Sequence, residues 1–219
     1  MRLSMLAAVL AVSSISLSAQ AQESVSLDPA GLRANNVEFE TAEYQGQQAL
    51  RVSGAPDNQN AYVALPVEGF SDGVITLRLV GDVAPETPPQ ARGFTGVAFR
   101  TADDGFEAIY LRPRNARVEN QLFRNRSVQY ISEPGYTWDR LREEHPGQYE
   151  TYVDMEMGVW IDVRIEVEGE TARLYVHDAE QPTLIVNDLR RGESEGGIGL
   201  WVGPWTVAHF ADVTVEHAE

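Results

Sequence analysis

Arginine side chains gather in one stretch of the sequence, IYLRPRNARVENQLFRNRSVQY, which runs from Ile109 to Tyr130. All 17 basic residues of the chain are arginines, and five of them lie here beside a single acid, Glu119, although the formal net charge is −16. Like-charged guanidinium groups repel each other unless acids or an anionic ligand compensate them. The stretch is therefore either a ligand site, suited to planar acidic groups, or a set of surface ion pairs.

Two-residue alternation predicts which of these side chains can meet. Along the expected strand Phe106–Pro113, Tyr110 and Arg112 share one face. The strands on either side would bring Arg100 and Gln129 to the same face, where a tyrosine ring can stack on a sugar and polar groups can bind its hydroxyls. The predicted ligand-binding residues are Arg100, Tyr110, Arg112, Arg114, Asn115, Gln129, Tyr130 and Trp138.

A second candidate region is the aromatic-rich stretch YISEPGYTWDRLREEHPGQYET, which spans Tyr130–Thr151. A long insertion of this kind often carries binding residues, and Trp138 is its best stacking residue; alternatively, the aromatic side chains cover an open end of the fold. Asp139 to Glu144 could form one or two helical turns before Pro146. If the protein is an enzyme, acid–base chemistry needs converging carboxylates or a histidine, and the candidates are Glu107, Glu150 and His145.

Several other chemistries lack a signal in the sequence. His177, His209 and His217 do not have the spacing of a zinc site, and no serine-hydrolase elbow, P-loop or dinucleotide fingerprint is present. The acidic balance argues against nucleic acid as a partner. The chain has no cysteine, so it has no disulfides and must rely on an ordinary core.

The N-terminus has the pattern of a secretory signal. Arg2 precedes the apolar segment Leu6–Leu17, and Ala19-Gln20-Ala21 has the small-x-small form of a cleavage site. We therefore expect a signal peptide at 1–21 and a single mature domain at 22–219, located in the periplasm or outside the cell. The apolar segment is too short to span a bilayer, and no other segment is apolar enough.

The mature sequence alternates between apolar and polar residues in about a dozen short segments separated by turn residues, which predicts an all-β, antiparallel β-sandwich. The segment VWIDVRIEV illustrates the pattern, with Val159, Ile161, Val163, Ile165 and Val167 predicted to face the core.

The order of three segments carries a resemblance: GFTGVAFRTADDGFEAIYLRP, VWIDVRIEVEGETARLYVHD and GGIGLWVGPWTVAHFADVTV. Over Val37 to Val215 the chain resembles the concanavalin A-like lectin/glucanase jelly rolls, including laminin-G-like domains, and looks nearest to the bacterial secreted 3-keto-disaccharide hydrolase-like domain. The Glu-x-Asp-x-x-Glu motif of the related glucanases is absent. The stretch after Tyr110 also departs from the hydrolase-like pattern.

The resemblance implies a structural calcium ion near the paired terminal strands, with Asp212 and Glu40 as its acidic ligands; calcium prefers such oxygen ligands. The function expected from the sequence is that of a secreted carbohydrate-binding domain, whose saccharide ligand could be acidic. Two alternatives stand beside it: a glycan-active hydrolase or lyase, and a structural or protein-interaction domain.

Overall fold

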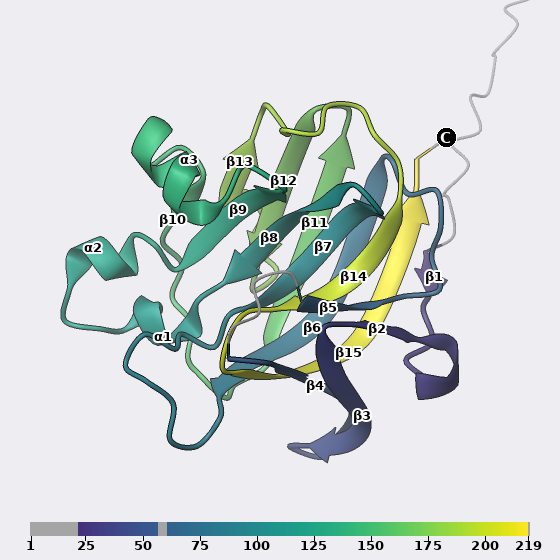
Figure 1. Ribbon diagram of the computed structural model, residues 1–219, viewed down its shortest axis with the longest axis horizontal. Helices are drawn as coiled ribbons and strands as arrows, with labels where there is room; N and C mark the ends of the chain where they lie inside the picture. The colour runs from purple at the N-terminus through teal and green to yellow at the C-terminus, as the bar shows by residue number, and fades with distance from the viewer. Residues whose placement is uncertain (1–21, 57–60, 219) are drawn as a thin grey trace, which may run out of the picture.

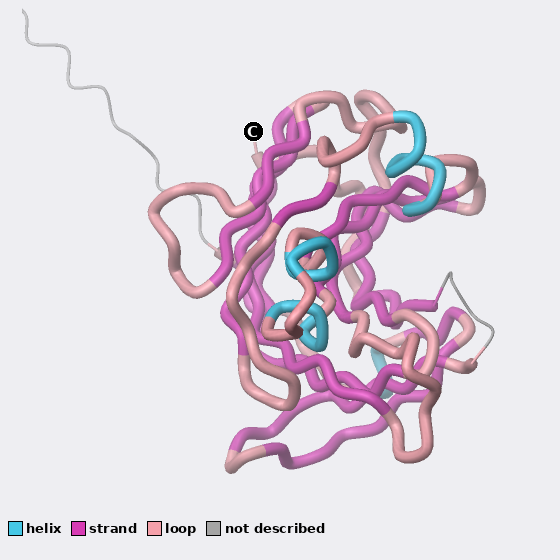
Figure 2. The backbone as a smooth tube through the Cα atoms, turned by 90° about the vertical axis from the view of Figure 1, so that its left-hand side faces the viewer, coloured by secondary structure: helices cyan, strands magenta, loops and turns pink. Residues whose placement is uncertain are grey.

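The computed structural model describes residues 22–56 and 61–218, and the expected signal peptide lies outside these ranges. Two antiparallel sheets form the fold (Figure 1), and the strands stand in two facing layers in Figure 2. The all-β sandwich predicted from alternation is confirmed. No helix within the described ranges is both long and apolar enough to cross a membrane.

The first sheet, sheet A, has eight strands in the order β13-β12-β11-β6-β15-β4-β3, with β1 paired to β15. In chain order its strands are β1 (Glu23–Ser24), β3 (Val37–Tyr44), β4 (Gln47–Gly54), β6 (Gly73–Val83), β11 (Ile161–Glu168), β12 (Thr171–Val176), β13 (Leu184–Val186) and β15 (Thr206–His217).

The second sheet, sheet B, has seven strands in the order β10-β9-β8-β7-β14-β5-β2. In chain order its strands are β2 (Arg33–Asn35), β5 (Ala61–Ala64), β7 (Thr95–Ala102), β8 (Gly105–Leu111), β9 (Val128–Glu133), β10 (Glu150–Thr151) and β14 (Gly197–Val202).

Short helices interrupt this pattern around β8 and β9. A 3₁₀ turn, η1 (Pro29–Gly31), follows β1, and three short α-helices, α1 (Pro113–Ala116), α2 (Gln121–Arg124) and α3 (Trp138–Glu144), lie beside β8 and β9 in Figure 1. Pro113 begins α1, where its fixed φ suits the first helical position. The Asn120 side chain accepts a hydrogen bond from the Phe123 N–H and so caps α2. The basic stretch therefore contains two helical turns between β8 and β9, and α3 confirms the turns predicted before Pro146.

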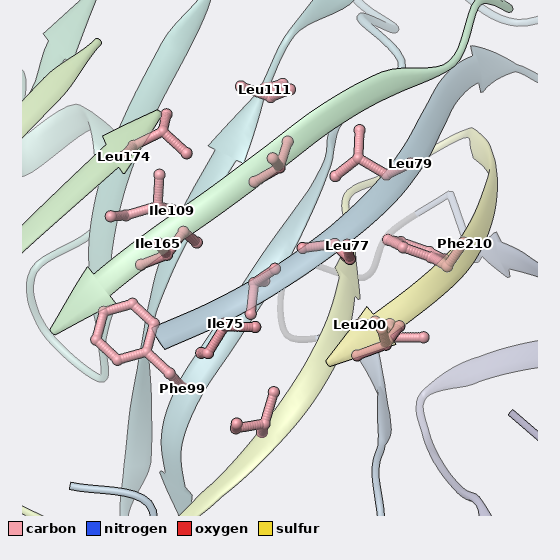
Figure 3. Close-up of a cluster of buried hydrophobic side chains, with 14 of the residues drawn as sticks. Ile75, Leu77, Leu79, Phe99, Ile109, Leu111, Ile165, Leu174, Leu200 and Phe210 are labelled. Carbon is pink, nitrogen blue, oxygen red and sulfur yellow. The ribbon is translucent and has the colours of Figure 1, made fainter. Parts of the chain in front are cut away.

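The main core lies between the two sheets. Leu77 and Ile165 of sheet A and Ile109 of sheet B are among its almost fully buried side chains (Figure 3). The alternation predicted for β11 holds for four core-facing residues, Ile161, Val163, Ile165 and Val167. The prediction for Val159 is wrong: the strand begins at Ile161, and the Val159 side chain is 44% exposed.

Candidate functional site

A cavity of about 330 Å³ lies against the outer face of sheet B, the face turned away from the main core. This volume is within the range of small-ligand sites. Its walls come from β8, β9 and β14, the loop before β7, the helical segment between β8 and β9, α3 and the turn after β14. The lining residues are Gln90, Arg92, Phe94, Tyr110, Arg112, Asn115, Phe123, Arg126, Ile131, Glu133, Trp138, Arg142, Trp201, Pro204 and Trp205.

The floor of the cavity is aromatic because of the strand register. Trp201 and Tyr110 are both paired with Gly96, on opposite sides of β7. Gly96 has no side chain, so the two rings meet over it with centroids 4.5 Å apart. A Cβ atom at Gly96 would lie 2.6 Å from the Cβ of Tyr110, closer than real Cβ contacts. The glycine therefore allows an apolar plate of the kind on which a sugar ring can stack.

Arg112 extends over this floor and is only 5% exposed. Its Nη2 donates to the Tyr110 hydroxyl at 2.7 Å and to Gln129 Oε1 at 3.3 Å, and its Nη1 donates to the Arg126 carbonyl at 3.1 Å. None of the carboxylates in the described ranges forms an ion pair with it. A buried charge without a countercharge is costly, and this guanidinium has hydrogen-bond acceptors but no acid.

Three further arginines line the cavity. Arg126 and Arg142 share one acid, Glu150, at 3.3 and 2.8 Å. Arg92 donates only to backbone carbonyls, including that of Ala91 at 3.1 Å. Burial lowers the pKa of Arg92, and the neighbouring guanidinium groups of Arg114 and Arg112 lower it further. The cavity thus carries an excess of positive charge in a protein that is acidic overall.

Two buried polar atoms of the lining have no hydrogen-bond partner within the described part of the chain: the Oδ1 of Asn115 and the Nε1–H of Trp201. Both side chains are 4% exposed. Native structures leave few such groups unsatisfied, so an unpaired acceptor and an unpaired donor are buried in the wall of the cavity.

Glu133 is the only acidic residue among the lining residues. Burial raises the pKa of its carboxyl, the backbone N–H of Gly135 lowers it, and the nearby Asp139 carboxylate raises it. Like Arg112, Glu133 forms no ion pair with another described residue. Trp138, 39% exposed, stands on the same side of the cavity with the Arg142 guanidinium 4.8 Å from its ring centre.

Four of the predicted ligand-binding residues line the cavity together: Tyr110, Arg112, Asn115 and Trp138. Gln129 lies behind them, where its buried amide accepts from Arg112 and donates to the Tyr149 carbonyl at 3.2 Å. Arg114 is exposed, donates to the Ala91 carbonyl at 3.3 Å and is not part of the lining.

The prediction that Arg100 shares a face with Tyr110 and Arg112 is wrong. The φ of Arg100 is +52°, and the register between β7 and β8 shifts between Phe99 and Ala102, so the alternation breaks at this point. The buried guanidinium binds the Asp72 carboxylate at 3.1 Å and the carbonyls of Gly169 and Gly192 at 2.7 Å each, away from the cavity.

Tyr130 also lies elsewhere, because it belongs to the main core on the inner face of β9. Its hydroxyl donates to Glu107 Oε1 at 2.7 Å and accepts from the Arg190 N–H at 2.8 Å. Tyr110 lies on the outer face of sheet B, but its neighbour Ile109 lies on the inner face. Tyr130 is paired with Ile109 across β8 and β9 and therefore also lies on the inner face.

The three candidate catalytic residues do not converge in the cavity. Glu107 is fully buried on the inner face, 3.6 Å from Arg100, and burial raises the pKa of its carboxyl. Glu150 is held by two arginines, and His145 packs against the Tyr149 ring with centroids 5.6 Å apart. None of the three is among the lining residues.

Asp212 and Glu40, the residues expected to bind calcium, each lie beside an arginine. Asp212 accepts a hydrogen bond from Gln47 at 2.7 Å and lies 3.9 Å from the Arg78 guanidinium, while Glu40 pairs with Arg51 at 3.2 Å. Within the described ranges no group of three or more histidine, aspartate or glutamate residues could hold a metal ion. The predicted pair is therefore compensated by arginines, and calcium binding stays a prediction.

Apart from Trp138, sequence reasoning missed the lining residues that come from outside the basic stretch. Trp201 and Glu133 could have been found by extending the alternation along β14 and β9, since Ile131 and Glu133 follow Gln129 on one face. Arg92 and Trp205 lie in turns, where alternation gives no information about side-chain direction.

Comparison of the sequence with protein families and with characterised proteins gives no match. Among solved structures, the chain is similar to carbohydrate-binding module CBM66 from Bacillus subtilis, with 15% identity and a TM-score of 0.58 over 85% of this chain and 95% of that one. It is also similar to a protein of unknown function with a galectin-like fold from Bacillus subtilis, with 12% identity and a TM-score of 0.54 over 86% and 90% of the two chains. The chain has a concanavalin A-like jelly-roll fold.

Proposed function

We propose that this protein is a secreted carbohydrate-binding domain that recognises an acidic saccharide in the cavity on the outer face of sheet B. The observation that carries the proposal is the nearly buried Arg112, which has no acidic partner and lies 5.0 Å from the centre of the Tyr110 ring, beside which Trp201 packs. A carboxylate or sulfate would supply the missing negative charge, and the plate would accept the apolar face of a sugar ring.

The remaining features of the cavity support a saccharide. Asn115 and Trp201 offer an unpaired acceptor and donor for hydroxyl groups, and Trp138 offers an exposed ring at the side. The fold is shared with a carbohydrate-binding module. The arginine excess is what distinguishes an acidic ligand from a neutral one.

The test is a glycan array that holds neutral, uronic-acid and sulfated oligosaccharides, followed by calorimetric titration of the glycans that bind. We expect acidic glycans to bind. Arg112→Gln should lower their affinity by about tenfold or more, because one charge-assisted contact contributes about 1.5–3 kcal/mol. Trp138→Ala should lower the affinity for these glycans as well.

Arg117→Gln is the matched control. Arg117 belongs to the same basic stretch, but it is exposed and pairs with Asp154 at 2.9 Å and Glu156 at 2.6 Å, outside the cavity lining. Its variant should bind as wild type does. Equal affinity of the wild type and the Arg112 and Trp138 variants for every bound glycan would place the site elsewhere.

The enzyme alternative has less support from this cavity. Hydrolysis by paired carboxylates needs two acids at the scissile bond, and Glu133 alone lines the cavity. Burial raises the pKa of the Tyr110 phenol, although Arg112 lowers it, so this hydroxyl is a poor base for a lyase. A protein-interaction role has no observation in its favour here.

Secretion follows from the N-terminal pattern, and the acidic surface suits a protein exported from the cell. We expect the mature chain to begin at Gln22. N-terminal sequencing of the exported protein is the measurement, and a mature chain that retains residues 1–21 would contradict it.

A further inference from the structure

The cavity is lined by two charges of opposite sign that have no ionic partner: Arg112, which is buried, and Glu133, which is half-buried. Arg112 and Glu133 both line it, and neither forms an ion pair within the described part of the chain. Burying an uncompensated charge is costly, yet Arg112 does not pair with Glu133. Arg112 bonds to Gln129 near the start of β9, whereas Glu133 is the last residue of that strand, so the cavity has a positive end and a negative end.

The strand β9 fixes the separation between these ends. Gln129, Ile131 and Glu133 follow one another on its outer face, with Gln129 bonded to Arg112 at 3.3 Å. Four residues of strand correspond to about 13 Å. The apolar side chain of Ile131 lies between the polar ends, and the interval is longer than a single sugar ring.

The helix α3 forms the wall beside this strand. The chain leaves β9 at Glu133, turns, and passes Trp138 and then Arg142, before Glu150 pairs with Gln129 at the start of β9. Trp138 therefore stands beside the interval between the two ends, and Arg142 stands toward the positive end. A ligand that lies along β9 would meet an arginine, an aromatic side wall and a carboxylate in succession.

We infer that the ligand is an oligosaccharide of at least two units that lies along β9 in one direction, with a uronic-acid unit at Arg112 and a neutral unit whose hydroxyls donate to Glu133. This inference rests on the proposed function and makes Glu133 a specificity-determining residue. A carboxylate accepts hydrogen bonds from sugar hydroxyls, and it repels a second acidic unit.

The experiment uses matched disaccharides of glucose in β-1,4 and α-1,4 linkage: the neutral sugar, the sugar with either unit oxidised to glucuronic acid, and the sugar with both units oxidised. Calorimetric titration of the wild type should give the order singly oxidised, then doubly oxidised, then neutral. Glu133→Gln should raise the affinity for the doubly oxidised sugar by about tenfold, because it removes a like-charge contact.

Asp139→Asn is the control variant. It removes the same charge from the neighbouring exposed carboxylate, which is not part of the lining, and it should change the ratio of the two acidic affinities by less than about twofold. An unchanged ratio in Glu133→Gln, with singly oxidised sugar still bound through Arg112, would overturn the inference and leave the proposed function standing. Failure of every oxidised sugar to bind the wild type would overturn the inference, but the proposed function would still stand if another acidic glycan of the array bound through Arg112. Failure of every acidic glycan would overturn both.

Discussion

Arg112 and Arg100 show at the scale of one residue two different environments for a buried arginine. The three hydrogen bonds of Arg112 go to a phenol, an amide and a backbone carbonyl, which satisfy the donors but leave the charge uncompensated. Arg100, equally buried, has Asp72 at 3.1 Å and Glu107 at 3.6 Å. The same residue type is thus structural in one place and available for binding in the other.

Glu133 should make stability depend on pH. Burial holds the pKa of its carboxyl in the folded state above the ordinary value of 4.5, which applies to the unfolded state. Between the unfolded and the folded pKa, the folded state therefore binds more protons than the unfolded state does. The free energy of unfolding should therefore fall as pH rises through this window. Urea unfolding of the wild type and Glu133→Gln between pH 4 and pH 7 should show that the variant loses less stability on going to pH 7.

Asp139→Asn provides a control of opposite sign. A hydrogen bond from the Thr137 side chain holds the pKa of Asp139 below its ordinary value, so this carboxyl contributes stability above the unfolded pKa and loses it as pH falls. Its removal should change the pH profile in the direction opposite to the removal of Glu133, and it should do so as pH falls below the ordinary value of 3.8, so the unfolding series for this variant extends below that pH. Parallel profiles for the wild type and Glu133→Gln would contradict the burial of Glu133.

At the scale of elements, Glu150 joins β10 to the structures around it. Its carboxylate, 10% exposed, forms ion pairs with Arg126, which follows α2, and with Arg142 of α3. Glu150→Gln would leave both guanidinium groups without an acid. We expect the free energy of unfolding, measured by urea titration, to fall by about 1.5–3 kcal/mol, the contribution of hydrogen bonds to charged groups.

Glu144→Gln is the matched control on α3. Glu144 pairs with Arg140 at 2.9 Å, one helical turn away, and both side chains are nearly half exposed. Exposed pairs of this type contribute about 0.3–0.5 kcal/mol. Equal effects of the two substitutions would show that Glu150 is not the link between β10, α3 and the α2 segment.

Individual elements also show how far the sequence predicts this structure. Alternation correctly separates Tyr110 from Ile109: Tyr110 lies on the outer face of β8 and Ile109 in the core, because a strand buried on its inner face fixes the register. It fails at Arg100, where a bulge and a positive φ turn the side chain around. It also cannot place Arg92, since its loop reaches the cavity only through contacts distant in sequence.

At the scale of the whole molecule, the protein surrounds a positive cavity with an acidic surface. The net charge is −16, and charges separated by more than about 10 Å are largely screened at 0.1 M salt. The contacts within the cavity are short and partly buried, and salt screens them much less. The overall acidity therefore affects solubility and distant encounters, while the proposed binding depends on the arginines of the cavity.

Neighbouring residues of β8 face opposite sides of sheet B, so the proposed function predicts that one contributes to stability and the next to binding. Ile109 points into the core that joins the two sheets, whereas Tyr110 points into the cavity and its hydroxyl accepts from Arg112. We expect Ile109→Ala to lower the free energy of unfolding by about 2–5 kcal/mol and to leave the affinity of the folded protein for singly oxidised disaccharides unchanged. Tyr110→Phe should lower the affinity and leave the free energy of unfolding nearly unchanged. The substitution keeps the ring on Trp201 but removes the acceptor that orients Arg112. Urea unfolding and calorimetric titration of both variants are the measurements. Reduced affinity in folded Ile109→Ala, or unchanged affinity in Tyr110→Phe, would show that the two faces of sheet B are not independent.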